Sequence, residues 1–564
     1  MRIYLFCLFI FTYITSYSQV FNSSFFNYPV KIPVLFSSNF GELRANHFHS
    51  GVDIKTQGKI GVPIYSAADG KIVRISVSSS GFGLALYIDH PNGTTTVYGH
   101  LDKFRDDIQQ YIRNIQYKRE SFNVDISVPP ETFQVAKGDL IAYGGNSGSS
   151  AGPHLHFEVR DTKTQTPVNP LLNYYSFNDN IPPEIEAVMF YPTSDDSHVL
   201  GKTIPQRKEV IKRNGKYQFR DSTALYAFGE IGFGIQTVDY LSGSNNKCGV
   251  YEIYLYDNDN LTYQFRMNHF SFDDTRYLNS HIDYAQYNNY KRLIHKTWVE
   301  PGNKLKLYPY LHNNGKTLLS DRQTHIIKFV IRDVAGNESI MEFPLISRQM
   351  DVVRETKVGL PLKHDVLFGI VNEEIDAKMP AGSFYSSFLF DYQRFESDST
   401  CFSPIFQLHN AEVPVHNSYD LKIKTVNLPE KLKSKAVIAV IDPRTGKKLS
   451  VGGTEENGWI KASVRQLGSF TVSVDTIPPQ IRPVNIQNKS EKVSFRITDN
   501  FTGIRSYRGE IDGKWALFEY DAKNNLIEYY FDPSRIQPNT NHRLKLTVVD
   551  GKENRSVYET SFFK

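Results

Sequence analysis

Three short segments of this sequence contain histidines, two of them with an acidic residue nearby, in a way that suits metal chemistry. Six of the 16 histidines fall between residues 47 and 156. Imidazole and carboxylate groups are donors that zinc takes in proteins. The segments are His47-Phe-His49-Ser-Gly-Val-Asp53, Tyr98-Gly-His100-Leu101 and Gly152-Pro-His154-Leu-His156-Phe-Glu158.

The spacing of His154 and His156 indicates how the two would act together. Residues two apart on a β-strand project from the same face, so both imidazoles point at one place. Zinc in a catalytic role takes three protein ligands and keeps a fourth position for water, whose pKa it lowers to about 7. Nearby histidines that are not ligands can move protons or stabilise a developing oxyanion. The segments therefore predict a hydrolytic metal site.

Some residues near these motifs have more than one interpretation. By spacing alone, His47 and His49 are equal candidates for the remaining imidazole ligand. Glu158 follows the strand periodicity onto the face of His156, where it is a candidate to support the metal ligands. His90 directly precedes the turn sequence Pro91-Asn92-Gly93, so we expect a solvated turn histidine there.

Short apolar segments separated by Gly, Asn and Pro position these motifs and predict β-strands. We expect strands over 60–66, 70–77, 84–90 and 94–100, and again from residue 133. Apolar residues recur at helical spacing within 102–119, which predicts one helix. The region that carries the motifs is thus predicted to be mainly β with a single helix.

Length and composition place this region in a larger, multidomain protein. A chain of 564 residues exceeds one compact domain. An aromatic share of 13%, mostly Tyr and Phe, favours β structure. A hydrophobic share of 40% excludes a wholly disordered chain, and a net charge of +4 does not suggest the concentrated basic surface of a nucleic-acid binder.

An internal repeat follows residue 178. Three segments match in the same order, which predicts two copies of one β-sandwich (Ig-like) module, the first with insertions. The double proline in each copy suits an interdomain joint. The matches pair Asp179-Asn-Ile-Pro-Pro-Glu-Ile185 with Asp475-Thr-Ile-Pro-Pro-Gln-Ile481, Asp239-Tyr-Leu-Ser-Gly243 with Asp499-Asn-Phe-Thr-Gly503, and Ile331-Arg-Asp333-Val-Ala-Gly-Asn337 with Val548-Val-Asp550-Gly-Lys-Glu-Asn554.

These boundaries predict five segments of the chain. They are a signal peptide at 1–18, the motif-bearing domain at 19–178, a β-sandwich module at 179–348, a β-rich module at 349–474 and a second β-sandwich module at 475–564. Downstream of residue 178 the sequence shows no clustered Cys, His or acidic set of the metal-binding type. We therefore expect these modules to be non-catalytic spacers, surface or partner contacts, or a lid.

The first residues indicate export. Arg2, an apolar run from Ile3 to about Ile14 and small residues near Ser16 and Ser18 are typical of a secretory signal peptide, with cleavage before Gln19. The run is shorter than the roughly 20 residues that span a bilayer, so we expect no transmembrane anchor.

The three cysteines do not change this interpretation. Cys7 lies inside the apolar run and not at its end, which disfavours lipidation. For Cys248 and Cys401, two buried free thiols are favoured over a disulfide.

The three motifs resemble the signatures of the lysostaphin-type (LytM-type) zinc metallopeptidases. The segment from Gly61 to Gly70 is similar to the strand and turn that follow the aspartate of that family. Lys137 to Ala142 is similar to the segment before its glycine-rich turn. The resemblance covers roughly residues 40–161 and implies an antiparallel β fold with a groove over a zinc ion.

The resemblance also implies residue roles. His49, Asp53 and His156 would bind one zinc ion, which selects His49 over His47, and His100 and His154 would be the catalytic histidines. The connection between residues 101 and 135 is longer than in the compact secreted members and contains the predicted helix. We expect it to line one end of the groove or to shield the site.

The implied activity is that of a zinc metalloendopeptidase, which hydrolyses stem or cross-bridge peptides of peptidoglycan in cell-wall remodelling. We expect it in the periplasm, in the cell envelope or outside the cell, with an envelope protein partner reached through the C-terminal β modules. Two alternatives stay open: a non-hydrolytic envelope-binding or regulatory protein with the same fold, and a secreted bacteriolytic toxin. Zymography on peptidoglycan, with and without a chelator, distinguishes a metallopeptidase from the non-hydrolytic protein. Substrate specificity and location distinguish a cell-wall remodelling enzyme from the toxin.

Overall fold

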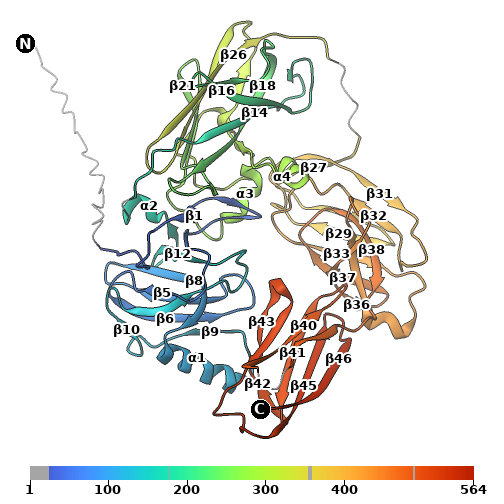
Figure 1. Ribbon diagram of the computed structural model, residues 1–564. Helices are drawn as coiled ribbons and strands as arrows, with labels where there is room; N and C mark the ends of the chain where they lie inside the picture. The colour runs from blue at the N-terminus through green and yellow to red at the C-terminus, as the bar shows by residue number, and fades with distance from the viewer. Residues whose placement is uncertain (1–24, 176, 353–357, 487–489) are drawn as a thin grey trace, which may run out of the picture.

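The computed structural model describes residues 25–175, 177–352, 358–486 and 490–564. Over these residues the protein is mainly β, which confirms the predicted fold class. Figure 1 shows a β domain followed by three β modules in a ring, in which the last module lies beside the first domain. The predicted signal peptide at 1–18, including Cys7, lies outside the described residues.

An antiparallel sheet of 11 strands forms the N-terminal domain. The predicted strands are present, and β4, β12 and β8 are direct neighbours, so the three motifs lie on adjacent strands or next to them. The main path runs β1 (Phe36–Ser38), β4 (Val52–Lys55), β12 (His154–Asp161), β8 (Thr94–Phe104), β7 (Leu84–Asp89), β6 (Gly70–Val77) and β10 (Gln134–Val135). Four more strands of this sheet pair outside the main path, namely β5 (Val62–Tyr65), β9 (Val124–Ser127), β11 (Leu140–Gly144) and β13 (Pro167–Val168). A separate hairpin is formed by β2 (Leu43–Arg44) and β3 (His47–Phe48).

The predicted helix is present as α1 (Asp106–Arg119). It begins later than expected because β8 continues through Phe104, where it still pairs with β11. Ile108 and Ile112 are buried against the domain core, as their spacing predicted. Acidic residues occupy the first turn and basic residues the last, which suits the helix dipole.

The second module is built on a sheet of 13 strands. Its main path runs β17 (Lys216–Phe219), β16 (Gln206–Arg213), β14 (Glu184–Pro192), β18 (Tyr226–Tyr240), β26 (Glu338–Ser347), β25 (Thr324–Arg332), β20 (Glu252–Asp257), β21 (Asn260–Arg266) and β23 (Tyr310–Leu311). Four short strands also pair with β18, namely β15 (His198–Val199), β19 (Lys247–Cys248), β22 (His295–Lys296) and β24 (Thr317–Leu319). Short helices flank or interrupt the strands, namely α2 (Pro170–Asn173), η1 (Thr275–Tyr277), α3 (Leu278–His281), α4 (Tyr284–Tyr290) and η2 (Asn313–Gly315).

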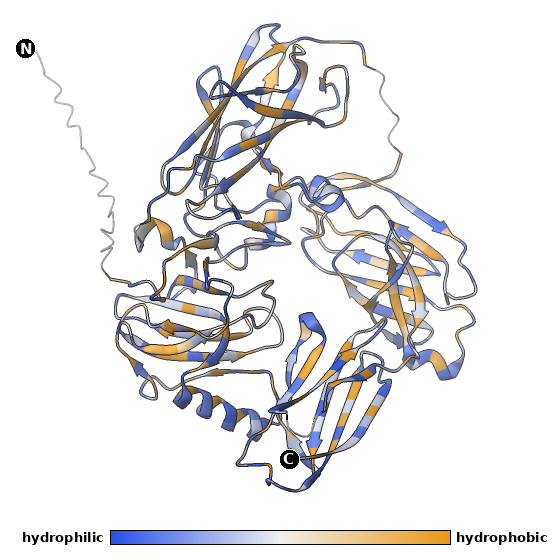
Figure 2. Ribbon diagram, in the orientation of Figure 1, coloured by the Kyte–Doolittle hydropathy of each residue, from blue (hydrophilic) through white to orange (hydrophobic). Residues whose placement is uncertain are grey.

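The third and fourth modules each contain two main sheets. In the third module one sheet contains β28 (Phe368–Val371), β29 (Ile375–Met379), β33 (Tyr419–Lys424), β37 (Trp459–Val464) and β36 (Thr454–Glu456). The other contains β31 (Tyr392–Phe395), β32 (Ile405–Leu408), β38 (Gly468–Val474), β34 (Ala436–Ile441) and β35 (Lys448–Gly452). The remaining elements of this module are β27 (Leu360–Leu362), β30 (Phe388–Phe390) and η3 (Glu430–Lys435). In the fourth module the two sheets are β39 (Gln480–Asn485), β40 (Lys492–Thr498), β44 (Leu526–Tyr530) and β43 (Glu519–Asp521), and β42 (Lys514–Ala516), β41 (Ile504–Ile511), β45 (Asn541–Asp550) and β46 (Arg555–Phe563), with η4 (Ala522–Asn524). Figure 2 shows hydrophobic and hydrophilic residues alternating along many of these strands, as expected for strands with one face in a core.

The hydrophobic core of the second module includes side chains from the N-terminal domain. Phe40, Leu43 and Phe48 are buried in the same cluster as Phe265 and Phe270. The Phe48 ring lies 5.4 Å from the ring of Phe270 between centroids. The segment that leads into the first histidine motif is therefore packed on the second module.

The fourth module closes the ring by packing on α1. The ring of Trp515 meets Tyr117 edge to face at 5.1 Å, and the Arg535 guanidinium lies 3.4 Å from the centroid of the same tyrosine. Arg508 forms an ion pair with Glu120 at 2.6 Å. The inserted helix therefore docks the C-terminal module, a role that the sequence did not suggest.

The expectation for His90 is wrong, and that for the two cysteines is confirmed only in part. His90 is not a solvated turn residue: it is buried, and its ring contacts the Asp69 carbonyl at 2.8 Å and Thr96 Oγ1 at 2.7 Å. Cys248 and Cys401 are both free thiols, as favoured, but only Cys248 is buried. Among the described residues, no helix is long and apolar enough to cross a bilayer.

Replacing Trp515 by Ala should loosen the fourth module from α1. Loss of the aromatic contact and its buried area should weaken the interface by about 1–3 kcal/mol. Hydrogen exchange of the α1 amides should then rise roughly tenfold in the full-length chain, since 1.4 kcal/mol is a factor of ten. Trp459→Ala, in β37 of the third module, is the control and should leave α1 protected. Equal exchange of α1 in both variants would contradict this contact.

Candidate functional site

Strand pairing brings the acidic and histidine motifs together. In the antiparallel pairing of β4 with β12, Asp53 lies opposite His156, and His156 in turn lies opposite Gly99 of β8. His49 lies in the turn before β4. Gly51 allows this turn to pass close to β12, since a Cβ there would collide with the Phe157 carbonyl.

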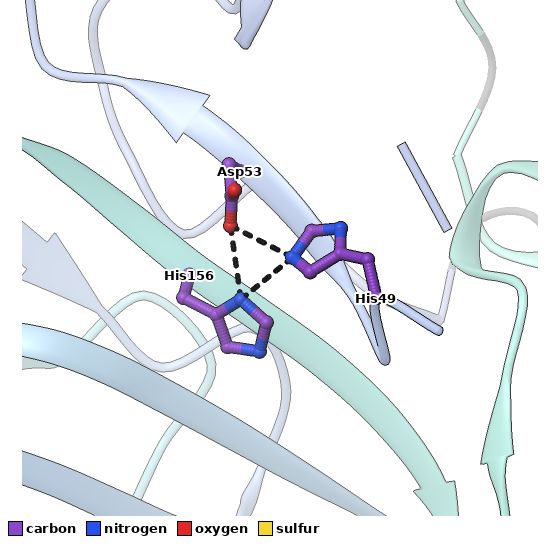
Figure 3. A group of neighbouring side chains, drawn as sticks. All are labelled: His49, Asp53 and His156. Atoms are coloured by element: carbon purple, nitrogen blue, oxygen red, sulfur yellow. Dashed lines mark hydrogen bonds and ion pairs between the residues drawn. The ribbon is translucent and has the colours of Figure 1, made fainter. Parts of the chain in front are cut away.

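His49, Asp53 and His156 converge on one point (Figure 3). Asp53 Oδ1 lies 3.0 Å from His49 Nε2 and 2.9 Å from His156 Nδ1, and the two nitrogens are 3.0 Å apart. Zinc bonds of about 2.0–2.1 Å in a tetrahedron place ligand atoms about 3.3 Å apart, so small shifts of these side chains would admit the ion. His47 is exposed and its ring contacts the Ala45 carbonyl, so the structure brings His49, and not His47, to this group.

Hydrogen bonds fix which ring nitrogen of each histidine faces the centre. His49 donates its Nδ1–H to the Asn39 carbonyl at 2.8 Å, which leaves Nε2 for a ligand. His156 donates its Nε2–H to Glu158 Oε1 at 2.8 Å, which leaves Nδ1. Such outer contacts are what orient histidine ligands in metal sites.

Glu158 supports His156 from within the core, as its strand position suggested. It is fully buried and accepts hydrogen bonds from Ser50, His156 and Arg160, the last at 2.6 Å from Arg160 Nε. Burial acts to raise the pKa of Glu158, but the Arg160 charge and the hydrogen bond from His156 outweigh it and lower the pKa to about 2.

The electrostatics of the group favour a cation at its centre. Burial opposes the charged form of His156, but hydrogen bonds to Asp53 and Glu158 outweigh burial and raise its pKa to about 9. Burial likewise acts against ionised Asp53, but the charge of His49 and hydrogen bonds from His154, His156 and His49 hold the pKa of that carboxyl well below its usual range. A metal cation satisfies the same demand for positive charge.

His100 reaches the site from an irregular point of β8. Its φ of 58° is in the left-handed region, which costs energy for a residue other than glycine. The pairing of β8 with β7 and with β11 changes register beside it, as at a β-bulge that redirects a side chain. Its ring lies 4.8 Å from His154 and 5.8 Å from His156 between centroids.

His100 and His154 are oriented alike. His100 donates its Nδ1–H to the Ser147 carbonyl at 2.9 Å, and His154 donates its Nδ1–H to the Gly152 carbonyl at 2.8 Å. These contacts engage Nδ1 of each ring and leave Nε2 for other partners; that of His154 lies 3.5 Å from Asp53 Oδ1. Burial, together with the charges of His156 and His154, lowers the pKa of His100 to about 3, so this ring is neutral at neutral pH.

Two residues that sequence reasoning missed also contact this group. Arg44 of β2 donates from Nη2 to Asp53 Oδ2 at 3.0 Å. Phe82 stacks on the His156 ring with 4.9 Å between centroids. Nothing in the sequence pattern marks either residue, because both reach the site through the fold.

Comparisons with known proteins identify the N-terminal domain. Residues 47–117 and 123–170 match the model of peptidase family M23, and residues 362–475 match a Zu5-like domain, which overlaps the expected third module at 349–474. The predicted resemblance is confirmed for the N-terminal domain, which is a domain of peptidase family M23, the lysostaphin-type metallopeptidases.

Three of the matched proteins align with 20–27% of this chain. DD-carboxypeptidase/endopeptidase Mpg of Neisseria meningitidis serogroup B is 30% identical over 151 residues, which are 26% of this chain and 28% of that protein. Peptidoglycan DD-endopeptidase ShyB of Vibrio cholerae is 34% identical over 111 residues, 20% of each chain. The crystal structure of a zinc-containing peptidase from Vibrio cholerae is 30% identical and covers 27% of this chain and 39% of that one, with a TM-score of 0.20. The chain thus spans less than a third of the length of these two curated relatives.

Replacing Arg160 by Ala should strongly destabilise the N-terminal domain. The substitution leaves the carboxylate of Glu158 buried without its ionic partner, which costs about 3–5 kcal/mol. Arg74→Ala is the control, because Arg74 pairs with Asp125 at the surface and its loss should cost about 0–1 kcal/mol. Denaturant unfolding of both variants measures the difference, and equal costs would contradict a buried ionic support for His156.

Proposed function

We propose that the M23 domain of this chain is a zinc-dependent endopeptidase that hydrolyses peptide bonds in the stem or cross-link peptides of peptidoglycan. The observation that supports this most directly is the convergence of His49, Asp53 and His156, with His100 and His154 beside them. The matched relatives include two named as peptidoglycan DD-endopeptidases, which supports the choice of substrate.

One zinc ion would be held by His49 Nε2, Asp53 and His156 Nδ1. Two imidazoles and a carboxylate are a donor set that catalytic zinc takes, with a further position left for water or substrate. The bound ion supplies Lewis acidity that polarises the scissile carbonyl and favours deprotonation of a water molecule. Asn39 and Glu158 hold the two imidazoles in the orientation that this requires.

His100 and His154 are assigned to proton transfer. In each ring Nδ1 is engaged by a backbone carbonyl, which leaves Nε2 for proton transfer. Such a nitrogen can accept a proton from the attacking water and later return it to the leaving amine. While protonated, the same ring can stabilise the tetrahedral oxyanion by donating a hydrogen bond.

We further propose that the protein works in the cell envelope, in the periplasm or outside the cell, because the substrate is located there. The three downstream modules position the M23 domain and offer surfaces to an envelope protein partner. The second module packs against the segment that leads into the first histidine motif, and the fourth module packs on α1. Both contacts support a positioning role.

Substitution of the five residues should separate metal binding from chemistry. Asp53→Ala and His156→Ala should lose both zinc and hydrolysis of cross-linked muropeptides, because each removes a ligand. His100→Ala and His154→Ala should keep close to one zinc per chain and lose about 10²–10⁴-fold in rate. His47→Ala is the matched control and should keep both. Zinc content is measured by elemental analysis, and wild-type hydrolysis by Asp53→Ala would refute the assignment.

Removal of downstream modules should have unequal effects. A chain that ends at residue 178 exposes Phe40, Leu43 and Phe48 next to His49, so it should aggregate or lose zinc. A chain that ends at residue 474 keeps that packing and should stay soluble and bind zinc. Solubility and zinc content of the two truncated chains test this. A stable, active chain ending at 178 would show that the second module is not needed for the site.

A further inference from the structure

The aspartates that mark the internal repeat meet in space in both copies. In each set, one carboxylate oxygen per residue lies within 4.8 Å of the others. The expectation that the downstream modules hold no acidic set of the metal-binding type is therefore wrong. The aspartates of each set are far apart in sequence and come together only in the folded chain. The sets are Asp179, Asp239 and Asp333 in the second module, and Asp475, Asp499 and Asp550 in the fourth.

The first set lies at the end of the second module that joins the N-terminal domain. Asp179 precedes the double proline that leads into β14, Asp239 is the penultimate residue of β18, and Asp333 directly follows β25. The three carboxylates are therefore positioned by one interdomain joint and two core strands.

Asp239 is a buried carboxyl that the protein itself leaves without a partner. It is 0% exposed, and neither side-chain oxygen has a hydrogen-bond donor at ordinary geometry, although the Tyr240 backbone N–H acts weakly on it. Burial and the like charges of Asp333 and Asp179 raise its pKa to about 8. The ionised form of this carboxyl is therefore costly to bury unless a cation compensates it.

The other two carboxylates are held in place by donors that still leave room at the centre. Asp179 Oδ1 accepts hydrogen bonds from Ser242 N at 3.0 Å and Ser242 Oγ at 2.8 Å, but Asp179 Oδ2 is buried and has no donor. Asp333 is oriented by Asn337, whose N and Nδ2 donate to its two oxygens at 2.9 and 2.7 Å. Three buried oxygens of Asp179 and Asp239 therefore stay available as ligands.

We propose that Asp179, Asp239 and Asp333 bind one Ca²⁺ ion at the joint between the M23 domain and the second module. Hard cations take oxygen ligands, whereas zinc prefers nitrogen and sulfur. Ca–O bonds of about 2.3–2.6 Å place oxygens on opposite sides of the ion about 4.6–5.2 Å apart. One oxygen from each of the three residues lies within 4.8 Å of the others, which is compatible with a shared ion of that size. Mg²⁺ gives up its waters reluctantly and is rarely held by protein oxygens alone, so Ca²⁺ suits this set better.

The set in the fourth module is a natural comparison, because its oxygens are more fully bonded. Thr502 donates to Asp475, and the backbone N–H groups of Phe501 and Gly503 donate to Asp499. The amine of Lys552 lies near enough to interact electrostatically with Asp475. A lysine thus already compensates part of the negative charge there, so we assign the Ca²⁺ to the set around Asp239.

The proposed Ca²⁺ site is linked to the histidine motif through backbone contacts. Asp239 pairs with Cys248 between β18 and β19, and the next residue, Gly249, is bound at both its N–H and its carbonyl by the Asn39 side chain at 2.8 and 2.6 Å. The carbonyl of Asn39 accepts the hydrogen bond from His49. Ca²⁺ would therefore also steady the segment that orients a proposed zinc ligand. This consequence rests on the proposed function, whereas the Ca²⁺ site does not.

The test uses the full-length chain stripped with EDTA, dialysed, and titrated calorimetrically with CaCl₂ alone. We expect saturable Ca²⁺ binding and a melting temperature raised by several degrees, with no such rise in equal MgCl₂. Asp239→Asn should abolish that binding and that rise. In EDTA, however, it should melt at or above the wild-type temperature, because a buried unpaired carboxylate has been removed.

Asp499→Asn, the counterpart in the fourth module, is the matched control and should keep both the binding and the rise. Asp179→Asn retains an acceptor for Ser242 and should weaken Ca²⁺ binding at least tenfold. This second variant tests the proposal if Asp239→Asn does not fold. Absence of Ca²⁺ binding to the wild-type chain, or full binding by the Asp179 or Asp239 variant, would overturn the proposal. Neither result would bear on zinc binding by His49, Asp53 and His156, which is measured separately.

Discussion

The site depends on the antiparallel register of β4 and β12. This pairing sets Asp53 opposite His156 and thereby fixes two of the three proposed ligands on rigid strands. A slip by one residue would turn His156 to the other face of the sheet, because side chains alternate along a strand. Gly51 and the packing of Phe48 on the second module then determine where His49 meets the pair. The proposed metal site is thus a consequence of sheet register and of one interdomain contact.

Buried carboxylates recur in this molecule, and they differ in the donors that the protein provides for them. Glu158 is surrounded by donors from Ser50, His156 and Arg160, so the protein alone stabilises its charge. Asp239 lacks such donors and lies among other acids, which is why we assign a cation to it. In both cases the group supports a neighbouring element, a histidine ligand in one and an interdomain joint in the other.

The sequence predicted features that depend on local pattern and missed those that depend on the fold. Strands around the motifs and the helix after β8 follow from periodicity, although the start of the helix moved because β8 extends to Phe104. His90 was misjudged because the turn sequence beside it does not reveal that Asp69 and Thr96 enclose its ring. Arg44 gives no sequence signal. The repeat did align the aspartates of both sets, but only the folded chain shows that they meet.

The central claim is that three side chains from β4, β12 and the turn before β4 hold a single zinc ion. Anomalous diffraction from crystals of the full-length chain, recorded on both sides of the zinc absorption edge, tests it most directly. The account predicts one zinc peak about 2.0–2.2 Å from His49 Nε2, an Asp53 carboxylate oxygen and His156 Nδ1. A peak bound by His47, or crystals of zinc-loaded, active protein with no peak between these three residues, would contradict it.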